Sequence, residues 1–136
     1  MQIKSSGAVL RIVSENKSID DISDSLNTRP TRCFIKGQLF SKRNPNSKKR
    51  ENNIWLLESG LKESESLELH IQQLISFIKE KQGAFKKLKL DCEIEIMCSF
   101  SSGNGQGGFT LNHELLQELT ESGIDLVVNL YPPERR

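Results

Sequence analysis

The residues best able to do chemistry in this chain are basic, and they are concentrated in one segment. Between residues 32 and 50 there are seven basic residues and no acidic one: Arg32, Lys36, Lys42, Arg43, Lys48, Lys49 and Arg50. The chain as a whole has a formal charge of +1, so this +7 segment leaves 12 basic and 18 acidic residues, a charge of −6, for the rest. Such a segment attracts an anionic partner over a distance, and the attraction weakens with salt. The alternative is a solvated hairpin tip that keeps the protein soluble and protects an edge strand.

A second candidate is the glycine-rich stretch from residue 101 to residue 108. Its core, Gly103-Asn104-Gly105-Gln106-Gly107-Gly108, satisfies the pattern Gly-x-Gly-x-x-Gly. A dinucleotide site requires a helix directly after the glycines, whereas Phe109-Thr110-Leu111 intervene here. Two interpretations therefore remain. The glycines form a tight or bulged chain reversal, or their exposed amides form a rim that binds an anion or a partner.

Trp55 is the only tryptophan in the chain, and two roles suit it. It can pack against a helix with its indole N–H bonded to one acceptor, or it can line a pocket beside Arg32 and Lys36. In the second role Glu58 and Ser59 lie close to the same pocket, because they follow Trp55 at the end of a strand.

The pattern of nucleophiles and bases does not favour catalysis. His70 and His113 are the only histidines, and the sequence places no serine or cysteine beside either one. Glu93 and Glu95 share one face of a strand, which is typical of a solvated surface rather than of acid–base chemistry. We therefore expect no catalytic residue, no metal and no cofactor.

The three cysteines, Cys33, Cys92 and Cys98, show no metal-binding spacing and cannot all pair within one chain. We expect buried free thiols in a reducing cytoplasm, with Cys33 as the first choice if one of them were catalytic. No apolar run approaches the roughly 18 residues of a membrane span, and the first residues lack the apolar core of a secretory signal. The expected location is the cytoplasm, without membrane contact.

The elements that must position these residues follow from hydrophobic periodicity and capping residues. Helices are expected after Ser18, after Ser64 or Ser66, and after Asn112, with breaks at Gly83 and Gly123. Strands are expected at residues 8–14, 31–39, 53–58, 92–100 and 124–130, and a polar loop at 41–53.

The order β-α-β-β-α-β, followed by a helix and a strand, predicts an α+β fold. It matches a ferredoxin-like (split β-α-β) sheet with helices on one face, extended by a C-terminal helix and strand. A chain of 136 residues is the length of one domain, which we expect to span residues 1–136 with a core at about 8–131.

Several short motifs of this chain resemble a bacterial family of unknown function, the one numbered forty-two seventy-nine. The resemblance covers roughly residues 8 to 131 and is carried by Pro30-Thr31-Arg32, Lys36-Gly37, Trp55-Leu56-Leu57-Glu58-Ser59, Gly107-Gly108-Phe109, Leu115-Leu116 and Leu130-Tyr131. It implies a small, usually single-domain protein of bacterial or phage origin, and it transfers no catalytic residue.

Together these observations predict a non-enzymatic protein that binds an anionic protein surface or a phosphorylated ligand. The bacterial and phage character of the family implies an immunity protein, or an inhibitor in phage defence or counter-defence. The first alternative is a domain that sequesters a nucleotide or cyclic-oligonucleotide signal, using Arg32 and Lys36 for phosphate, Trp55 for stacking, and the amides of Gly103, Asn104, Gly105 and Gly107. Nucleic-acid binding is a further alternative but is not favoured, because few aromatic residues interrupt the basic segment. A homodimer through an exposed sheet face or edge is compatible with the sequence.

Overall fold

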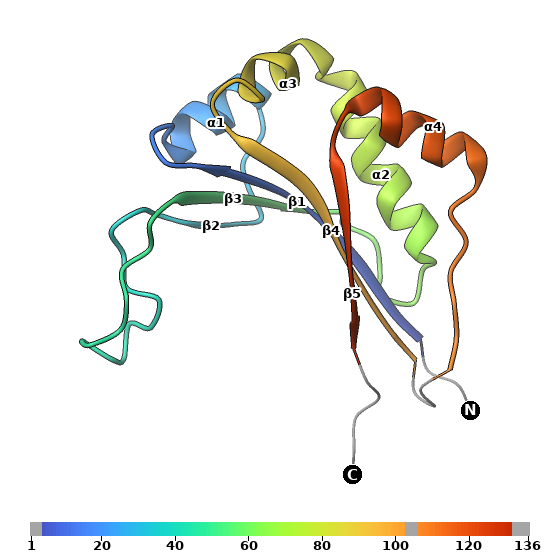
Figure 1. Ribbon diagram of the computed structural model, residues 1–136, viewed down its shortest axis with the longest axis horizontal. Coiled ribbons are helices and arrows are strands. Elements are labelled where there is room, and N and C mark those ends of the chain that lie inside the picture. Colours follow the sequence, from blue (N-terminus) through green and yellow to red (C-terminus); the bar gives the residue numbers. More distant parts are fainter. Residues whose placement is uncertain (1–3, 103–105, 132–136) are drawn as a thin grey trace. The chain divides into compact units, whose positions relative to one another are not determined.

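A mixed β-sheet of five strands organises the protein, which is an α+β structure. The computed structural model describes residues 4–102 and 106–131 (Figure 1). Within this part of the chain the strands are β1 (Lys4–Ser14), β2 (Arg32–Phe34), β3 (Asn53–Glu58), β4 (Glu93–Ser102) and β5 (Asp125–Tyr131). The order in the sheet is β2-β3-β1-β4-β5, with β2 antiparallel to β3 and β4 parallel to β5.

The packing divides the described residues into two compact units. Unit 1 consists of the described residues of Met1–Leu10, Glu58–Glu80 and Glu95–Arg136, and unit 2 consists of Arg11–Leu57 and Lys81–Ile94. The strands β1 and β4 contribute residues to both units.

Unit 2 is built on the helices α1 (Ile19–Leu26) and α3 (Gln82–Leu88), which pack together (Figure 1). The Ser18 hydroxyl accepts a hydrogen bond from the backbone N–H of Asp21 at 3.0 Å and so caps α1, as its sequence position predicts. The helix ends where Asn27 adopts the left-handed conformation, with φ of 48°.

The core of unit 2 includes Trp55, whose side chain is fully buried on β3. Its indole N–H donates to the hydroxyl of Ser23 on α1 over 3.0 Å. This bond gives a buried polar group its partner and fixes the helix against the strand.

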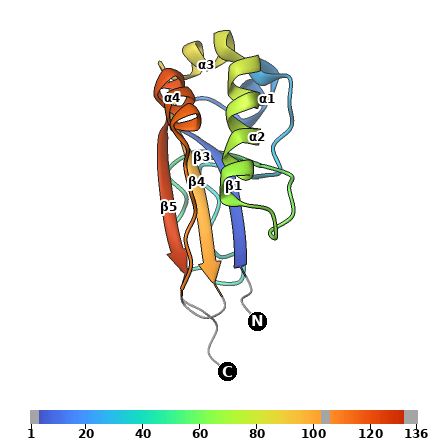
Figure 2. The same ribbon diagram turned by 90° about the vertical axis from the view of Figure 1, so that its right-hand side faces the viewer.

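In unit 1 the long helix α2 (Leu67–Glu80) packs against α4 (His113–Ser122), as Figure 2 shows. The buried face of α2 carries an apolar stripe of Leu67, Ile71, Leu74, Ile75 and Ile78. Asn112 caps α4 by accepting from the N–H of Leu115 at 2.8 Å, and Gly123 ends it with φ of 66°. On β4, every second residue from Ile96 to Ser102 is buried, as the period of two predicts.

One expected strand is much shorter in the structure. The strand expected at 31–39 pairs only over Arg32–Phe34, because the chain then turns: Gln38 N–H donates to the Ile35 carbonyl and Gly37 has φ of 91°. On β5, which ends the strand order and has one neighbour, Leu130 is 71% exposed. None of the described helices has the length and hydropathy of a membrane span.

Removing the partner of the Trp55 indole tests this core directly. We expect Ser23→Ala to lower the free energy of unfolding by about 1–3 kcal/mol, because it leaves a buried N–H unsatisfied. Urea unfolding followed by the fluorescence of the single tryptophan measures the change. Ser25→Ala on the same helix is the matched control, since Ser25 is exposed and gains the same helix propensity. Equal effects of the two substitutions would contradict a stabilising role for this bond.

Candidate binding site

The basic segment folds back on itself through a short backbone ladder. The N–H of Gly37 donates to the carbonyl of Arg50 at 2.9 Å, and the N–H of Arg50 donates to the carbonyl of Gln38 at 2.7 Å. One step further out, the N–H of Phe40 donates to the carbonyl of Lys48 at 2.9 Å. This ladder pairs residues 37–40 with residues 48–50 and sets Phe40 opposite Lys48.

The guanidinium of Arg50 stacks on two aromatic rings. Its central carbon lies 3.8 Å from the centroid of Phe34 and 4.5 Å from that of Phe40. Arg32 also approaches the Phe34 ring, at 5.9 Å. Cation–π contacts of this kind contribute about 0.5–1 kcal/mol each at exposed sites. Arg50 therefore has a structural role in addition to its charge.

A groove of about 770 Å³ lies along this part of unit 2, and we call it the basic groove. It is lined by Arg11, Phe40, Lys48, Lys49, Arg50, Glu51, Asn52 and Ile54. Four of these residues are cationic and only Glu51 is anionic, so the lining of the groove has an excess of positive charge. The Phe40 side chain is 58% exposed and offers an apolar contact beside the charges.

The structure brings together only part of the predicted basic set. Lys48, Lys49 and Arg50 line the basic groove, whereas the exposed Lys42 and Arg43 are not among its lining residues. The ammonium of Lys36 lies 3.9 Å from a carboxylate oxygen of Glu15, so an acid outside the segment offsets its charge.

Five lining residues were absent from the sequence prediction: Arg11, Phe40, Glu51, Asn52 and Ile54. Of these, Arg11 adds a cation and Phe40 an exposed ring. Arg11 interrupts the apolar run of β1, and that break in pattern is the feature that points to it. Phe40 stands in a polar loop, and only the register of the backbone ladder reveals its neighbours.

Trp55 is not available as a stacking platform. Its ring is fully buried and its N–H is bonded to Ser23, which agrees with the packing interpretation. We therefore leave Trp55 out of the candidate site. Because the ring is buried, it cannot stack on a ligand beside Arg32 and Lys36 as the alternative hypothesis requires.

The glycine-rich loop belongs to unit 1. Gly103, Asn104 and Gly105 lie outside the described residues. Gly107 has φ of 151°, and a Cβ added there would lie 3.3 Å from the Cβ of Ser102. The hydroxyl of Ser102 donates to the carbonyl of Gln106. The positive φ and the close approach to Ser102 explain why a glycine stands at position 107.

His70 has a serine partner, although the sequence placed none beside it. The Ser59 hydroxyl lies 2.6 Å from Nδ1 of His70, because α2 returns along the end of β3 with His70 on its buried face. His70 is 1% exposed, and its Nε2 has no partner among the described residues. The hydrogen bond between Ser59 and His70 joins the end of β3 to α2 within unit 1.

The cysteines divide by environment, and the expectation that all are buried is wrong for Cys33. Cys33 is exposed on β2, Cys92 is half-buried and Cys98 is buried on β4. Burial raises the pKa of Cys98 to about 12 and also raises that of Cys92. In the described part of the chain no group of three or more His, Cys, Asp or Glu side chains is arranged to hold a metal ion.

The fold and the basic groove define the class of the protein as an α+β domain with a mixed five-stranded sheet and a cationic surface. Residues 1–133 match the family model described as Domain of unknown function (DUF4279), and the chain belongs to that family. A comparison with curated proteins and one with solved structures found no match.

The thiol environments predict a sharp difference in reactivity. At pH 8 about one Cys98 side chain in ten thousand is a thiolate if its pKa is about 12. We expect a disulfide reagent to modify Cys33 rapidly in the native protein, and Cys98 only after unfolding. Mass spectrometry of the labelled protein measures both, and Cys33→Ser should remove the fast phase. Equal labelling rates for Cys98 and Cys33 would contradict the burial of Cys98.

Proposed function

We propose that this protein is a non-enzymatic binding protein and that its basic groove engages an anionic partner. The observation that carries the proposal is the gathering of Arg11, Lys48, Lys49 and Arg50 around one groove beside the exposed Phe40. Complementary charge accelerates encounter and selects partners of opposite sign.

The charges of the two units support the same surface. Unit 2 contains 14 basic and 7 acidic residues, whereas unit 1 contains 5 basic and 11 acidic ones. The sequence contrast between a +7 segment and a −6 remainder thus follows the division into units. An anionic partner is attracted to unit 2 and repelled by unit 1.

The partner that we favour is an acidic protein surface, as the family resemblance implies for an immunity or phage-defence inhibitor. A loop that presents several lysines and one exposed phenylalanine offers charge complementarity with an apolar contact, a combination common in protein interfaces. Both the role in immunity or phage defence and the acidic protein as partner are part of this proposal.

A nucleotide or a nucleic acid is the second candidate, and Phe40 is the observation that favours it. With Trp55 buried, Phe40 is the ring positioned beside Lys48 and Arg50 for stacking on a base. Stacking of a base on an aromatic side chain contributes about 1–3 kcal/mol.

We also propose that the first four strands form a ferredoxin-like arrangement. The order β2-β3-β1-β4 supports it, because β3 separates β1 from β2, and β1 separates β3 from β4. In this arrangement one strand is inserted between the two strands of each β-α-β unit, and β5 is the C-terminal extension of the sheet.

Charge reversal in the basic groove tests the proposed function. We expect Lys48→Glu/Lys49→Glu to weaken anion binding at least about tenfold, because each reversal replaces attraction by repulsion. Fluorescence anisotropy measures binding to labelled poly-glutamate, oligothymidine, duplex DNA and a cyclic dinucleotide at low and moderate salt. The matched control is Lys86→Glu/Lys87→Glu, a second exposed lysine pair of unit 2 on α3, with the same change in net charge.

The control decides between a site and a general charge effect. Equal losses from the two reversals, or no salt-sensitive binding of any probe, would contradict the proposal. Phe40→Ala separates the partner classes, since it should weaken oligothymidine or the dinucleotide about tenfold if a base stacks there. A much smaller effect on poly-glutamate is expected, because that polymer has no ring.

A further inference from the structure

Ser59 and His70 place a nucleophile beside a base in unit 1. The hydroxyl oxygen of Ser59 lies 2.6 Å from Nδ1 of His70, which is within hydrogen-bond reach. Ser59 follows β3, and His70 lies on the buried face of α2 with 1% of its surface exposed. Both residues belong to Glu58–Glu80, so the pair is separate from the basic groove of unit 2. The proposed function does not use this pair.

The other contacts of Ser59 indicate the direction of its hydrogen bond to His70. The backbone N–H of Leu61 donates to the Ser59 oxygen at 3.4 Å, so this oxygen already accepts one hydrogen bond. The Ser59 hydroxyl hydrogen still needs an acceptor, and Nδ1 of His70 is the acceptor beside it. We therefore assign the neutral tautomer in which Nε2 carries the ring hydrogen and the lone pair of Nδ1 faces the hydroxyl. Nε2 is buried without a partner among the described residues, and such an atom requires an explanation such as a chemical role.

Ser59 is accessible to a reagent, whereas its base is shielded from solvent. Ser59 is half-buried, and Gly60 follows it with φ of 80°, a left-handed conformation that favours glycine. A Cβ added at Gly60 would meet no atom within 4 Å apart from its chain neighbours, so the space beside Ser59 is open. The Ser59 N–H donates to the Ala8 carbonyl at 3.1 Å, which fixes the serine backbone against β1. The chain therefore holds the hydroxyl at an open turn with the imidazole of His70 behind it.

We propose that Ser59 is an activated nucleophile that accepts an acyl group from an activated ester, with His70 as the general base. The Ser59 oxygen forms a bond to the acyl carbon while the bond from that carbon to the leaving alkoxide breaks. The hydroxyl proton passes to Nδ1 of His70 and then to the alkoxide, which departs as an alcohol. One transfer leaves Ser59 acylated and requires no turnover. The inference therefore goes beyond the proposed function and is compatible with it.

Acetylation by p-nitrophenyl acetate tests the proposal, because this ester releases a coloured alkoxide. The full chain is used with the substitution Cys33→Ser, which removes the exposed thiol as a competing nucleophile. Absorbance measures the release of nitrophenolate, and peptide mass spectrometry locates the acetyl group and its rate of attachment. A positioned general base contributes about 10²–10⁴-fold to a reaction rate. We therefore expect Ser59 to be acetylated at least about a hundredfold faster than Ser64.

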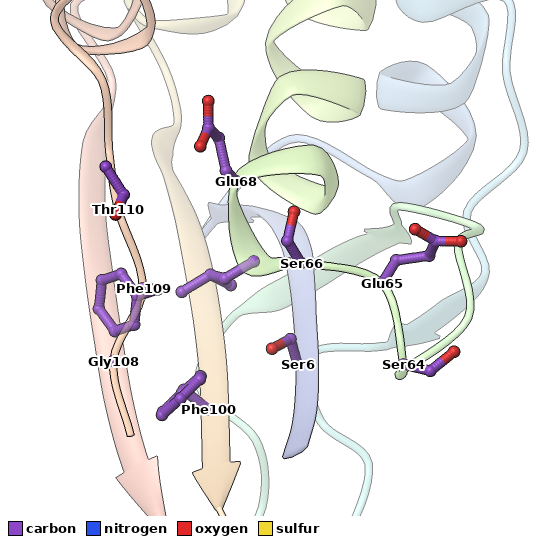
Figure 3. Close-up of a pocket in the computed structure, with 10 residues that line it drawn as sticks. Ser6, Ser64, Glu65, Ser66, Glu68, Phe100, Gly108, Phe109 and Thr110 are labelled. Atoms are coloured by element: carbon purple, nitrogen blue, oxygen red, sulfur yellow. The ribbon is translucent and has the colours of Figure 1, made fainter. Parts of the chain in front are cut away.

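Ser64 is the matched control, because it is an exposed serine of the same chain segment. It lines a separate pocket of about 370 Å³ at the start of α2, and Figure 3 shows it on the loop that leads into this helix. No histidine is among the residues that line this pocket. Ser59→Ala should remove the fast phase of nitrophenolate release, whereas Ser64→Ala should leave it unchanged. Equal acetylation rates at Ser59 and Ser64 would overturn the proposal.

Two further measurements test His70 as the base. His70→Gln should slow the acetylation of Ser59 about a hundredfold, because an amide can keep the hydrogen bond but takes up no proton. If this variant fails to fold, heavy water gives the answer with His70 in place, since a proton transferred in the transition state slows the reaction there. An unchanged rate in folded His70→Gln, or equal rates in the two solvents, would contradict the role of His70. Lys48→Glu/Lys49→Glu in unit 2 should leave the acetylation of Ser59 unchanged, which keeps the two proposals separately testable.

Discussion

The stacking of one guanidinium on two phenylalanine rings is the interaction on which the basic groove depends. Arg50 lies over Phe34, which belongs to β2, and over Phe40, which belongs to the loop. The same residue takes part in the backbone ladder on both its N–H and its carbonyl. Arg50 therefore contributes more than a positive charge. It holds the loop against the sheet and positions Lys48 and Lys49 at the basic groove.

The distribution of charge gives the two units different chemistry. A net charge of +1 conceals an excess of basic residues in unit 2 and of acidic residues in unit 1. The basic groove follows the sign of the unit that contains it, and an increase in salt should weaken the binding of its proposed anionic ligand through screening.

Local sequence rules predicted much of the fold. Ser18, Asn112 and Gly123 bound their helices as expected, because capping depends on residues within a few positions of one another. The site was harder to predict, since it depends on contacts across the chain. Ser59 bonds to His70, and Arg11 lines the basic groove with Lys48, Lys49 and Arg50. Both arrangements depend on how the strands align in the sheet, and the hydrophobic periodicity of the sequence does not encode this alignment.

The central claim is that an anionic partner binds at the basic groove, and an NMR map of the bound state tests it most directly. The account predicts that the tightest-binding anionic probe shifts the amide signals of Arg11, Phe40 and residues 48–50, with little change at Lys86 and Lys87. Shifts centred on α3, on unit 1 or spread evenly over all exposed lysines would contradict it.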